Sequence, residues 1–170
     1  LKELQDKYDF DYVYFCDASI NPKRANEIAL GIINSDLKPF KWWCFAFINL
    51  PWKEEYFENM AKSGCHFVDW GMESFHTDLS KKIGKPQTKE GLYRVIDLCQ
   101  KVNIQYGIQL IYNLPSETLE TAQYTLDCID EFMDKYGHDS GFPFAVVPFK
   151  YFRMTPYYIN HKMYGIVVFD

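Results

Sequence analysis

Hydrophobic and polar positions along the chain follow two alternating patterns. Short continuous apolar runs are typical of strands buried in a parallel sheet, and apolar residues at every third or fourth position are typical of helices. The runs predict strands at residues 12–16, 42–47, 67–70, 104–112 and 144–147. The spaced pattern predicts a helix end at 1–7 and helices within 21–33, 51–64, 88–102 and 116–133. Residues 151–170 are predicted to be irregular.

Capping residues mark where several of these helices begin. Asn21 stands before Pro22, Thr88 precedes a helical stretch, and Ser116 or Thr118 caps the last long helix. That helix is predicted to turn five apolar residues inward: Leu119, Ala122, Leu126, Ile129 and Met133. The run at 12–16 predicts a strand buried on both faces. Strict alternation of strands and helices predicts a parallel α/β sheet, either barrel-like or open and doubly wound.

Composition narrows the function classes. The 170 residues carry a net charge of −5 and form no basic stripe, which argues against a general nucleic-acid partner. No apolar run approaches the roughly 20 residues of a membrane helix. The five cysteines are scattered and odd in number, which indicates reduced thiols in a cytoplasmic protein and no metal site made from them. No linker divides the chain.

Candidate chemistry lies just after the strands, because parallel α/β folds bind ligands at the carboxyl ends of their strands. Polar side chains follow nearly every predicted strand there: Asp17, Asn49, Glu73, Ser74, Asn113, Glu117 and Arg153. Of the histidines, His66 is interpreted as packing. His76 follows the Glu73 loop, but no nucleophile is paired with it.

Two of these turns have both a functional and a structural interpretation. Gly71 allows close approach to a ligand, and the Glu73 carboxylate suits an ammonium group or ribose hydroxyls. Alternatively, Glu73 caps the next helix or pairs with Lys85. The turn at 113–118 leads into a helix N-terminus whose amides could meet a ligand. Capping by Ser116, with Glu117 favourable to the helix dipole, is its structural interpretation.

The order of the motifs resembles the radical S-adenosylmethionine (SAM) superfamily, including its B12-dependent, methylthiotransferase-like and peptide-maturation branches. The motifs are Phe15-Cys16-Asp17, Trp43 before a strand, Asn59-Met60-Ala61-Lys62-Ser63-Gly64-Cys65, Gly71-Met72-Glu73-Ser74, Lys85-Pro86-Gln87-Thr88, the turn 113–118 and Thr155-Pro156-Tyr157-Tyr158 followed by Tyr164-Gly165-Ile166. The match extends from about Tyr12 to Ile166.

This resemblance implies a partial (β/α) barrel of the radical SAM type, missing its first βα unit. It also implies a [4Fe–4S] cluster in the full-length protein that reductively cleaves SAM to a 5′-deoxyadenosyl radical, with cobalamin as a further candidate cofactor. The SAM-binding residues that it implies are Asp17, Glu73, Ser74, Lys85, Asn113 and Glu117. It assigns no catalytic residue.

Three features depart from the family pattern. The C-x-x-x-C-x-x-C motif is absent and is expected upstream of Leu1, so the chain is expected to be a truncated barrel domain with its core at 8–149 and an extension at 150–170. Phe47 stands where a polar residue is expected. Asn113 and Ser116 replace glycines, although asparagine tolerates a left-handed backbone.

The leading hypothesis is therefore the SAM-binding part of a radical enzyme that acts on a small molecule or a peptide. A degenerate barrel that serves as a non-catalytic binding or scaffold domain is the alternative. An unrelated barrel enzyme that uses Glu73 with Asp17 ranks last. Because the first strand is expected to be missing, we also expect the free edge of strand 12–16 to promote self-association.

Overall fold

Five parallel strands lie side by side in chain order in the computed structural model, which describes residues 1–137 and 143–167. They are β1 (Tyr12–Ile20), β2 (Lys41–Phe47), β3 (Cys65–Glu73), β4 (Gln105–Tyr112) and β5 (Phe144–Pro148). Each strand is hydrogen-bonded in parallel to the next. The predicted parallel α/β sheet is confirmed.

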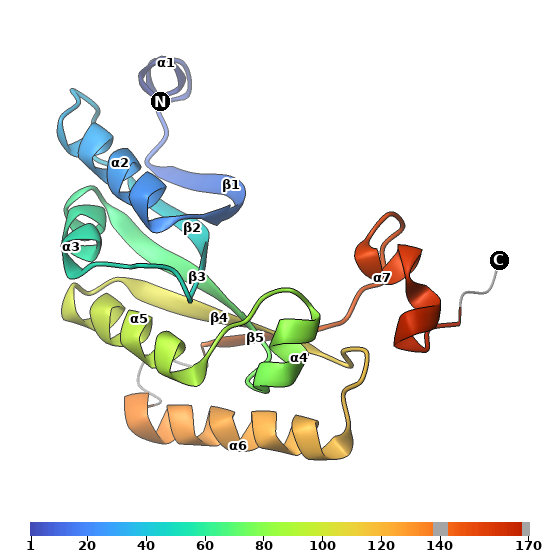
Figure 1. Ribbon diagram of the computed structural model, residues 1–170. Coiled ribbons are helices and arrows are strands. Elements are labelled where there is room, and N and C mark those ends of the chain that lie inside the picture. Colours follow the sequence, from blue (N-terminus) through green and yellow to red (C-terminus); the bar gives the residue numbers. More distant parts are fainter. Residues whose placement is uncertain (138–142, 168–170) are drawn as a thin grey trace.

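Helices connect the strands and lie along one side of the sheet (Figure 1). The longer connecting helices are α2 (Pro22–Ile33), α3 (Glu54–Lys62), α5 (Lys89–Lys101) and α6 (Leu119–Tyr136), and the short helix α1 (Lys2–Tyr8) precedes β1. A six-residue helix that the sequence pattern did not predict, α4 (Thr77–Lys82), follows β3. The described part of the chain contains no helix with the length and apolar character needed to cross a membrane.

Side-chain caps fix the helix starts. The Oδ1 atom of Asn21 accepts a hydrogen bond from the backbone N–H of Arg24 at 2.9 Å, and Oγ1 of Thr88 accepts one from Gly91 at 3.1 Å. Thr118 caps α6, with the backbone N–H of Thr121 donating at 3.2 Å, so this helix begins at the second of its two predicted caps. Each cap satisfies a backbone donor that would otherwise lack a partner.

The third helix begins at Glu54, three residues after the predicted start at Pro51. The indole of Trp52 explains the delay, because its N–H donates to the carbonyl of Phe47 at 2.8 Å and ties the segment back to the end of β2. The Trp52 ring also lies edge-on to Trp70, with ring centroids 5.3 Å apart.

The core lies between the sheet and the helices. Alternate residues of the central strands point to this side and are fully buried, and they include Trp42, Cys44, Val68, Trp70, Met72 and Ile108. From the helices, Phe57 of α3 and Phe132 of α6 are equally buried. The opposite face of the sheet is covered by none of the long helices (Figure 1).

Two predicted faces were wrong. The β1 strand is not buried on both faces: Tyr12 is 48% exposed and Tyr14 is 39% exposed, because β1 lies at the edge of the described sheet. In α6, Leu119 is 91% exposed and Leu126 is 55% exposed. This helix packs on the sheet through its second half, where the buried residues are Cys128, Ile129, Phe132 and Met133.

The C-terminal segment is more ordered than predicted. It forms α7 (Pro156–Ile159) and a 3₁₀ helix, η1 (His161–Tyr164), which lie apart from the sheet (Figure 1). Aromatic rings hold the segment together, with Tyr157 4.3 Å from Tyr164 and 5.1 Å from Phe149 between ring centroids. Residues 168–170 of the predicted extension lie outside the described residues.

Gly64 offers a test of how tightly the chain is held between α3 and β3. Its φ is +93°, and a Cβ there would meet the carbonyl oxygen of Phe40. We therefore expect Gly64→Ala to lower the free energy of unfolding by about 2–4 kcal/mol, the sum of backbone strain and overpacking. Denaturant unfolding monitored by circular dichroism measures this change.

The matched control is Gly84→Ala. Gly84 also has a positive φ, +75°, but no atom lies within 4 Å of an added Cβ. The control should lose only about 1 kcal/mol, the cost of the backbone conformation alone. Equal losses in the two variants would contradict the packing argument.

Candidate functional site

The open face of the sheet carries aromatic and polar side chains in register. Trp43 of β2 lies beside Phe67 of β3, and Phe45 lies beside Asp69. Two residues after Asp69, on the same face, Gly71 of β3 pairs with Gln109 of β4. Because side chains alternate between faces along a strand, these residues share the face opposite the core.

A cavity of about 260 Å³ lies at the carboxyl end of this face. Its lining includes Cys16, Asp17, Phe47, Glu73, Lys85 and Gln109. Three of the six predicted SAM-binding residues, Asp17, Glu73 and Lys85, therefore lie around one hollow where a parallel α/β fold binds its ligands.

The ion pair between Glu73 and Lys85 is the central feature of the cavity. Nζ of Lys85 donates to Oε1 of Glu73 at 2.5 Å, so the pairing considered as the structural interpretation of Glu73 is present. Glu73 is only 7% exposed, whereas the Lys85 side chain is 40% exposed. The lysine ammonium also lies 5.4 Å from the centre of the Phe47 ring. The pair combines a buried carboxylate with a cation that reaches solvent.

Local backbone geometry turns the Glu73 side chain into place. The β3–β4 register shifts between Gly71 and Glu73, and Glu73 itself has a φ of +63°. A Cβ on Gly71 would lie 3.1 Å from the Glu73 carboxylate, so glycine leaves space for that group. The sequence Gly71-Met72-Glu73 thus forms a bulge that directs the carboxylate over the open face.

Asp17 lies at the border of the cavity. It also lines a groove between α1 and α2. Its carboxylate lies close enough to the helix-covered face of the sheet to affect the Cys44 thiol there. Burial, together with the nearby Asp17 carboxylate, raises the pKa of the Cys44 thiol to about 12. Asp17 is therefore positioned less directly over the hollow than Glu73.

The other three predicted residues do not line the cavity. Ser74 is buried, and its Oγ accepts a hydrogen bond from the backbone N–H of His76 at 3.1 Å. The carboxylate of Glu117 accepts hydrogen bonds from the backbone of Asn113 and, at 3.3 Å, of Leu114. These contacts hold the turns. A SAM contact from Ser74, Asn113 or Glu117 stays a prediction.

The turn at 113–118 keeps the left-handed backbone that its sequence pattern requires. Asn113 has a φ of +60° and Ser116 a φ of +73°, the two positions at which the family pattern has glycine. Asparagine adopts this conformation at low cost, as predicted, and the Glu117 carboxylate supports the turn from within.

Two polar residues of the open face were not predicted. Asp69 is 8% exposed, and its Oδ2 atom accepts a hydrogen bond from Nε2 of Gln109 at 2.6 Å. Its other oxygen, Oδ1, is buried and has no hydrogen-bond partner within residues 1–137 and 143–167. A charged residue inside the apolar run 67–70 was the available sequence signal. The partner on β4 becomes apparent only from the register of the two strands.

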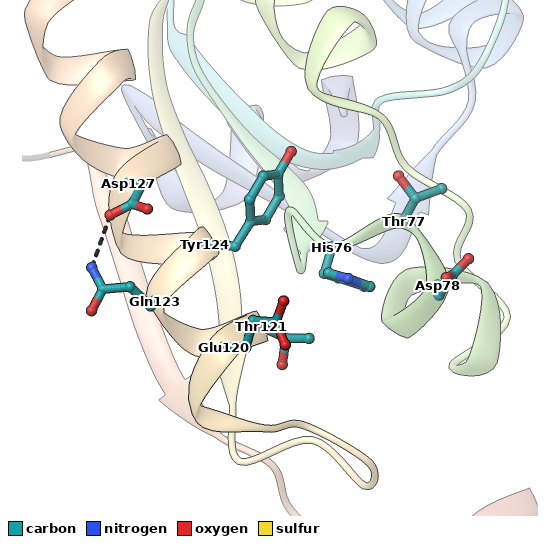
Figure 2. Close-up of a pocket in the computed structure, with 8 residues that line it drawn as sticks. All are labelled: His76, Thr77, Asp78, Glu120, Thr121, Gln123, Tyr124 and Asp127. Carbon is teal, nitrogen blue, oxygen red and sulfur yellow. Dashed lines mark hydrogen bonds between the residues drawn. The ribbon is translucent and has the colours of Figure 1, made fainter.

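A second and larger cavity, of about 670 Å³, lies between α4 and α6. Figure 2 shows its lining, in which His76 and Tyr124 approach edge to face with ring centroids 6.0 Å apart. Three acidic residues border it: Asp78, Glu120 and Asp127. None of the six predicted SAM-binding residues lines this cavity, so the candidate site is the smaller hollow on the open face.

Metal ligands do not gather in the described part of the chain. Within it, no group of three histidine, cysteine or acidic side chains could hold a metal ion. Cys16 is exposed and the other four cysteines are buried, none in a disulfide. These residues therefore supply no ligand set for a [4Fe–4S] cluster.

No protein-family model matches the chain. Among curated proteins, the heme chaperone HemW of Buchnera aphidicola subsp. Schizaphis graminum is 27% identical over 106 residues, covering 61% of this chain and 26% of HemW. The tryptophan 2-C-methyltransferase of Streptomyces laurentii is 27% identical over 131 residues, covering 72% of this chain and 20% of that enzyme. The chain thus spans about a fifth to a quarter of these relatives.

Solved structures extend the likeness to most of the chain. The radical SAM methyltransferase TsrM of Kitasatospora setae, with cobalamin and a [4Fe–4S] cluster bound, superposes with a TM-score of 0.72 at 21% identity, covering 93% of this chain and 31% of TsrM. HemN of Escherichia coli, coproporphyrinogen III oxidase and a radical SAM enzyme, superposes with a TM-score of 0.66 at 12% identity, covering 91% of this chain and 34% of HemN.

The chain has the radical SAM fold. The predicted partial parallel barrel and the predicted resemblance to the superfamily are confirmed. In the radical SAM fold of this chain, the hollow that contains Glu73 and Lys85 lies at the carboxyl ends of the strands, on the face turned away from the helices.

The raised pKa of Asp69 leads us to predict an unusual pH dependence of the free energy of unfolding. Burial raises the pKa of Asp69, the hydrogen bond from Gln109 opposes that rise, and the nearby carboxylate of Glu73 adds to it. A carboxyl group whose pKa is higher in the folded than in the unfolded chain destabilises the fold as the pH rises through that interval. We expect Asp69→Asn to raise the free energy of unfolding at pH 7.

The gain should shrink as the pH falls, and should vanish below about 4, the ordinary pKa of aspartate, where both states are protonated. Urea unfolding of wild type and Asp69→Asn at several pH values measures the difference. A variant that is less stable than wild type at pH 7 would show that the carboxylate is satisfied in the folded protein.

Proposed function

We propose that this chain is the SAM-binding part of a radical SAM iron–sulfur enzyme and that SAM occupies the hollow around Glu73 and Lys85. One observation carries the proposal: a buried carboxylate and a partly exposed ammonium group, paired at 2.5 Å, line a cavity at the carboxyl ends of parallel strands. The likeness of fold to SAM-dependent radical enzymes supports the same conclusion.

The charges of the pair suit the groups that SAM carries. The Glu73 carboxylate accepts hydrogen bonds from the ammonium group or the ribose hydroxyls, and Lys85 pairs with the SAM carboxylate. For SAM to bind in this way, Lys85 moves from Glu73 toward the ligand, as its partly exposed side chain allows. The Phe47 ring, which lines the same cavity, offers an apolar surface where the family pattern has a polar residue.

The chemistry of the whole protein is part of the proposal. In the whole protein a [4Fe–4S] cluster would supply one electron, and reductive cleavage of the C5′–S bond of SAM would give methionine and a 5′-deoxyadenosyl radical. The described residues hold no ligand set for the cluster. The part that we propose for them is to bind and orient SAM. Cobalamin, which is bound in the TsrM structure, a small-molecule or peptide substrate and a cytoplasmic location belong to the same proposal.

A non-catalytic binding or scaffold domain is the second candidate. The Glu73–Lys85 pair supports it, because mutual neutralisation stabilises the carboxylate without any ligand. Formation of 5′-deoxyadenosine by the whole protein, reconstituted under anaerobic conditions, separates the two candidates.

Glu73→Gln tests the SAM site directly. Replacing a carboxylate that binds an ammonium group or hydroxyls should weaken SAM binding roughly tenfold or more, the scale of a charged hydrogen bond. Isothermal titration calorimetry with SAM measures the dissociation constant.

Glu54→Gln is the matched control, because Glu54 also pairs with a lysine, Lys101, but on an exposed surface. The control should bind SAM as wild type does. Wild-type affinity in Glu73→Gln would reject the proposed role of Glu73.

Cys16 provides a chemical probe of the same hollow. It is the exposed thiol that lines the cavity, and the other four cysteines are buried. We expect N-ethylmaleimide to modify Cys16 first and SAM to slow that reaction severalfold by covering the thiol. Mass spectrometry of the time course measures the rate, with Cys16→Ser to confirm the site of labelling. A labelling rate that saturating SAM leaves unchanged would place SAM elsewhere.

A further inference from the structure

The open face has an aromatic floor. Tyr14 and Trp43 are stacked, with ring centroids 4.1 Å apart and planes 12° apart. Phe45 and Phe67 lie edge-on to Trp43 at 5.4 Å and 5.8 Å. Tyr14 is 39% exposed and the other three rings are half-buried, so part of this surface is open. A flat apolar molecule would bury it further, which is favourable.

A buried acid interrupts this floor. Asp69 lies between Phe45 on β2 and Gly107 on β4 in the register of the sheet. A Cβ on Gly107 would lie 2.8 Å from Oδ1 of Asp69 and 2.9 Å from the ring of Phe67, so glycine leaves room for both groups. The Oδ1 atom has no hydrogen-bond partner among the described residues, which is costly for a buried carboxylate.

The orientation of Gln109 follows from its contact with Asp69. An ionised carboxylate has only acceptors, so the amide NH₂ of Gln109 must face it, as the 2.6 Å contact from Nε2 to Oδ2 shows. The carbonyl oxygen of Gln109 then points away from Asp69. Because Gln109 lines the cavity, this part of the hollow presents acceptors.

Position along β3 separates Asp69 from the Glu73–Lys85 ion pair. Asp69 precedes Glu73 by four residues on β3, which corresponds to about 13 Å of strand. Gln109 lies in register with Gly71, two residues before Glu73, so a ligand that contacts Gln109 lies beside SAM in the same cavity.

We propose that Asp69 and Gln109 recognise the substrate, and that this substrate is a flat aromatic molecule with an N–H donor. The ring lies against Tyr14 and Phe45, which line the cavity, and its N–H donates to the carbonyl oxygen of Gln109, which the contact with Asp69 orients. This inference rests on the proposed function, because it names the substrate class of the same hollow.

Indole and benzofuran form a matched pair of probes, because they share size and shape but only indole carries an N–H. We expect the wild-type chain to bind indole about tenfold more tightly than benzofuran, the scale of one hydrogen bond to a charged group. Chemical-shift titration with each probe, in the presence and absence of SAM, measures both dissociation constants. Gln109→Leu and Asp69→Asn should bring the ratio close to one.

Gln105→Leu is the control. Gln105 lies on β4 beside Phe67, on the same face, but makes no contact with the Asp69 carboxylate in the hydrogen bonds of the described residues. It should keep the wild-type ratio. Circular dichroism of each variant establishes that it is folded.

The outcomes separate the two proposals. A ratio near one in wild type, with SAM binding intact, overturns this inference and leaves the proposed function standing. A tenfold preference for indole over benzofuran in a protein that does not bind SAM overturns the proposed function. The pair would then form a binding site, but its assigned role as a substrate site would be wrong. A tenfold ratio that survives in both Gln109→Leu and Asp69→Asn also overturns the inference.

Discussion

The sheet is covered by long helices on one face only, and the site depends on this asymmetry of burial. Trp42, Trp70 and Ile108 point to the helices and are fully buried, and they supply the apolar area that holds the sheet together. Their immediate neighbours along the strands point the other way. Side chains on that second face contribute less to the core, so the same strands can hold charged groups such as Asp69 and Glu73 there.

This asymmetry explains which parts of the fold the sequence could predict. Continuous apolar runs located the strands, and Asn21, Thr88 and Thr118 located helix starts through their capping chemistry. The face of each side chain was harder to predict. Trp42 and Trp43 are adjacent and equally apolar, yet one is fully buried and the other lies on the open face. An uninterrupted run carries no period-2 signal, so burial must be inferred from position in the sheet.

The site was predictable where its residues are local in sequence, and less so where they are not. Glu73 and Lys85 are separated by twelve residues, and their pairing was one of the alternatives that the sequence offered. Asp69 and Gln109 are separated by forty residues and meet only through the β3–β4 register. Glu117 resembled a ligand residue equally well, but its carboxylate is taken up by the backbone of its own turn. A carboxylate that lies next to backbone N–H groups without other partners accepts hydrogen bonds from them, so it is a poor candidate for a ligand contact.

The energetic costs in this part of the structure fall on the residues around the hollow. Glu73 has a left-handed backbone, which costs an ordinary residue about 1–2 kcal/mol. Asp69 keeps a buried oxygen without a partner among the described residues. Packing alone would favour glycine or asparagine in place of Glu73 and an apolar residue in place of Asp69. The first cost is offset if the Glu73 carboxylate is directed at a ligand, and the second accompanies the contact by which Asp69 orients Gln109 toward the same cavity.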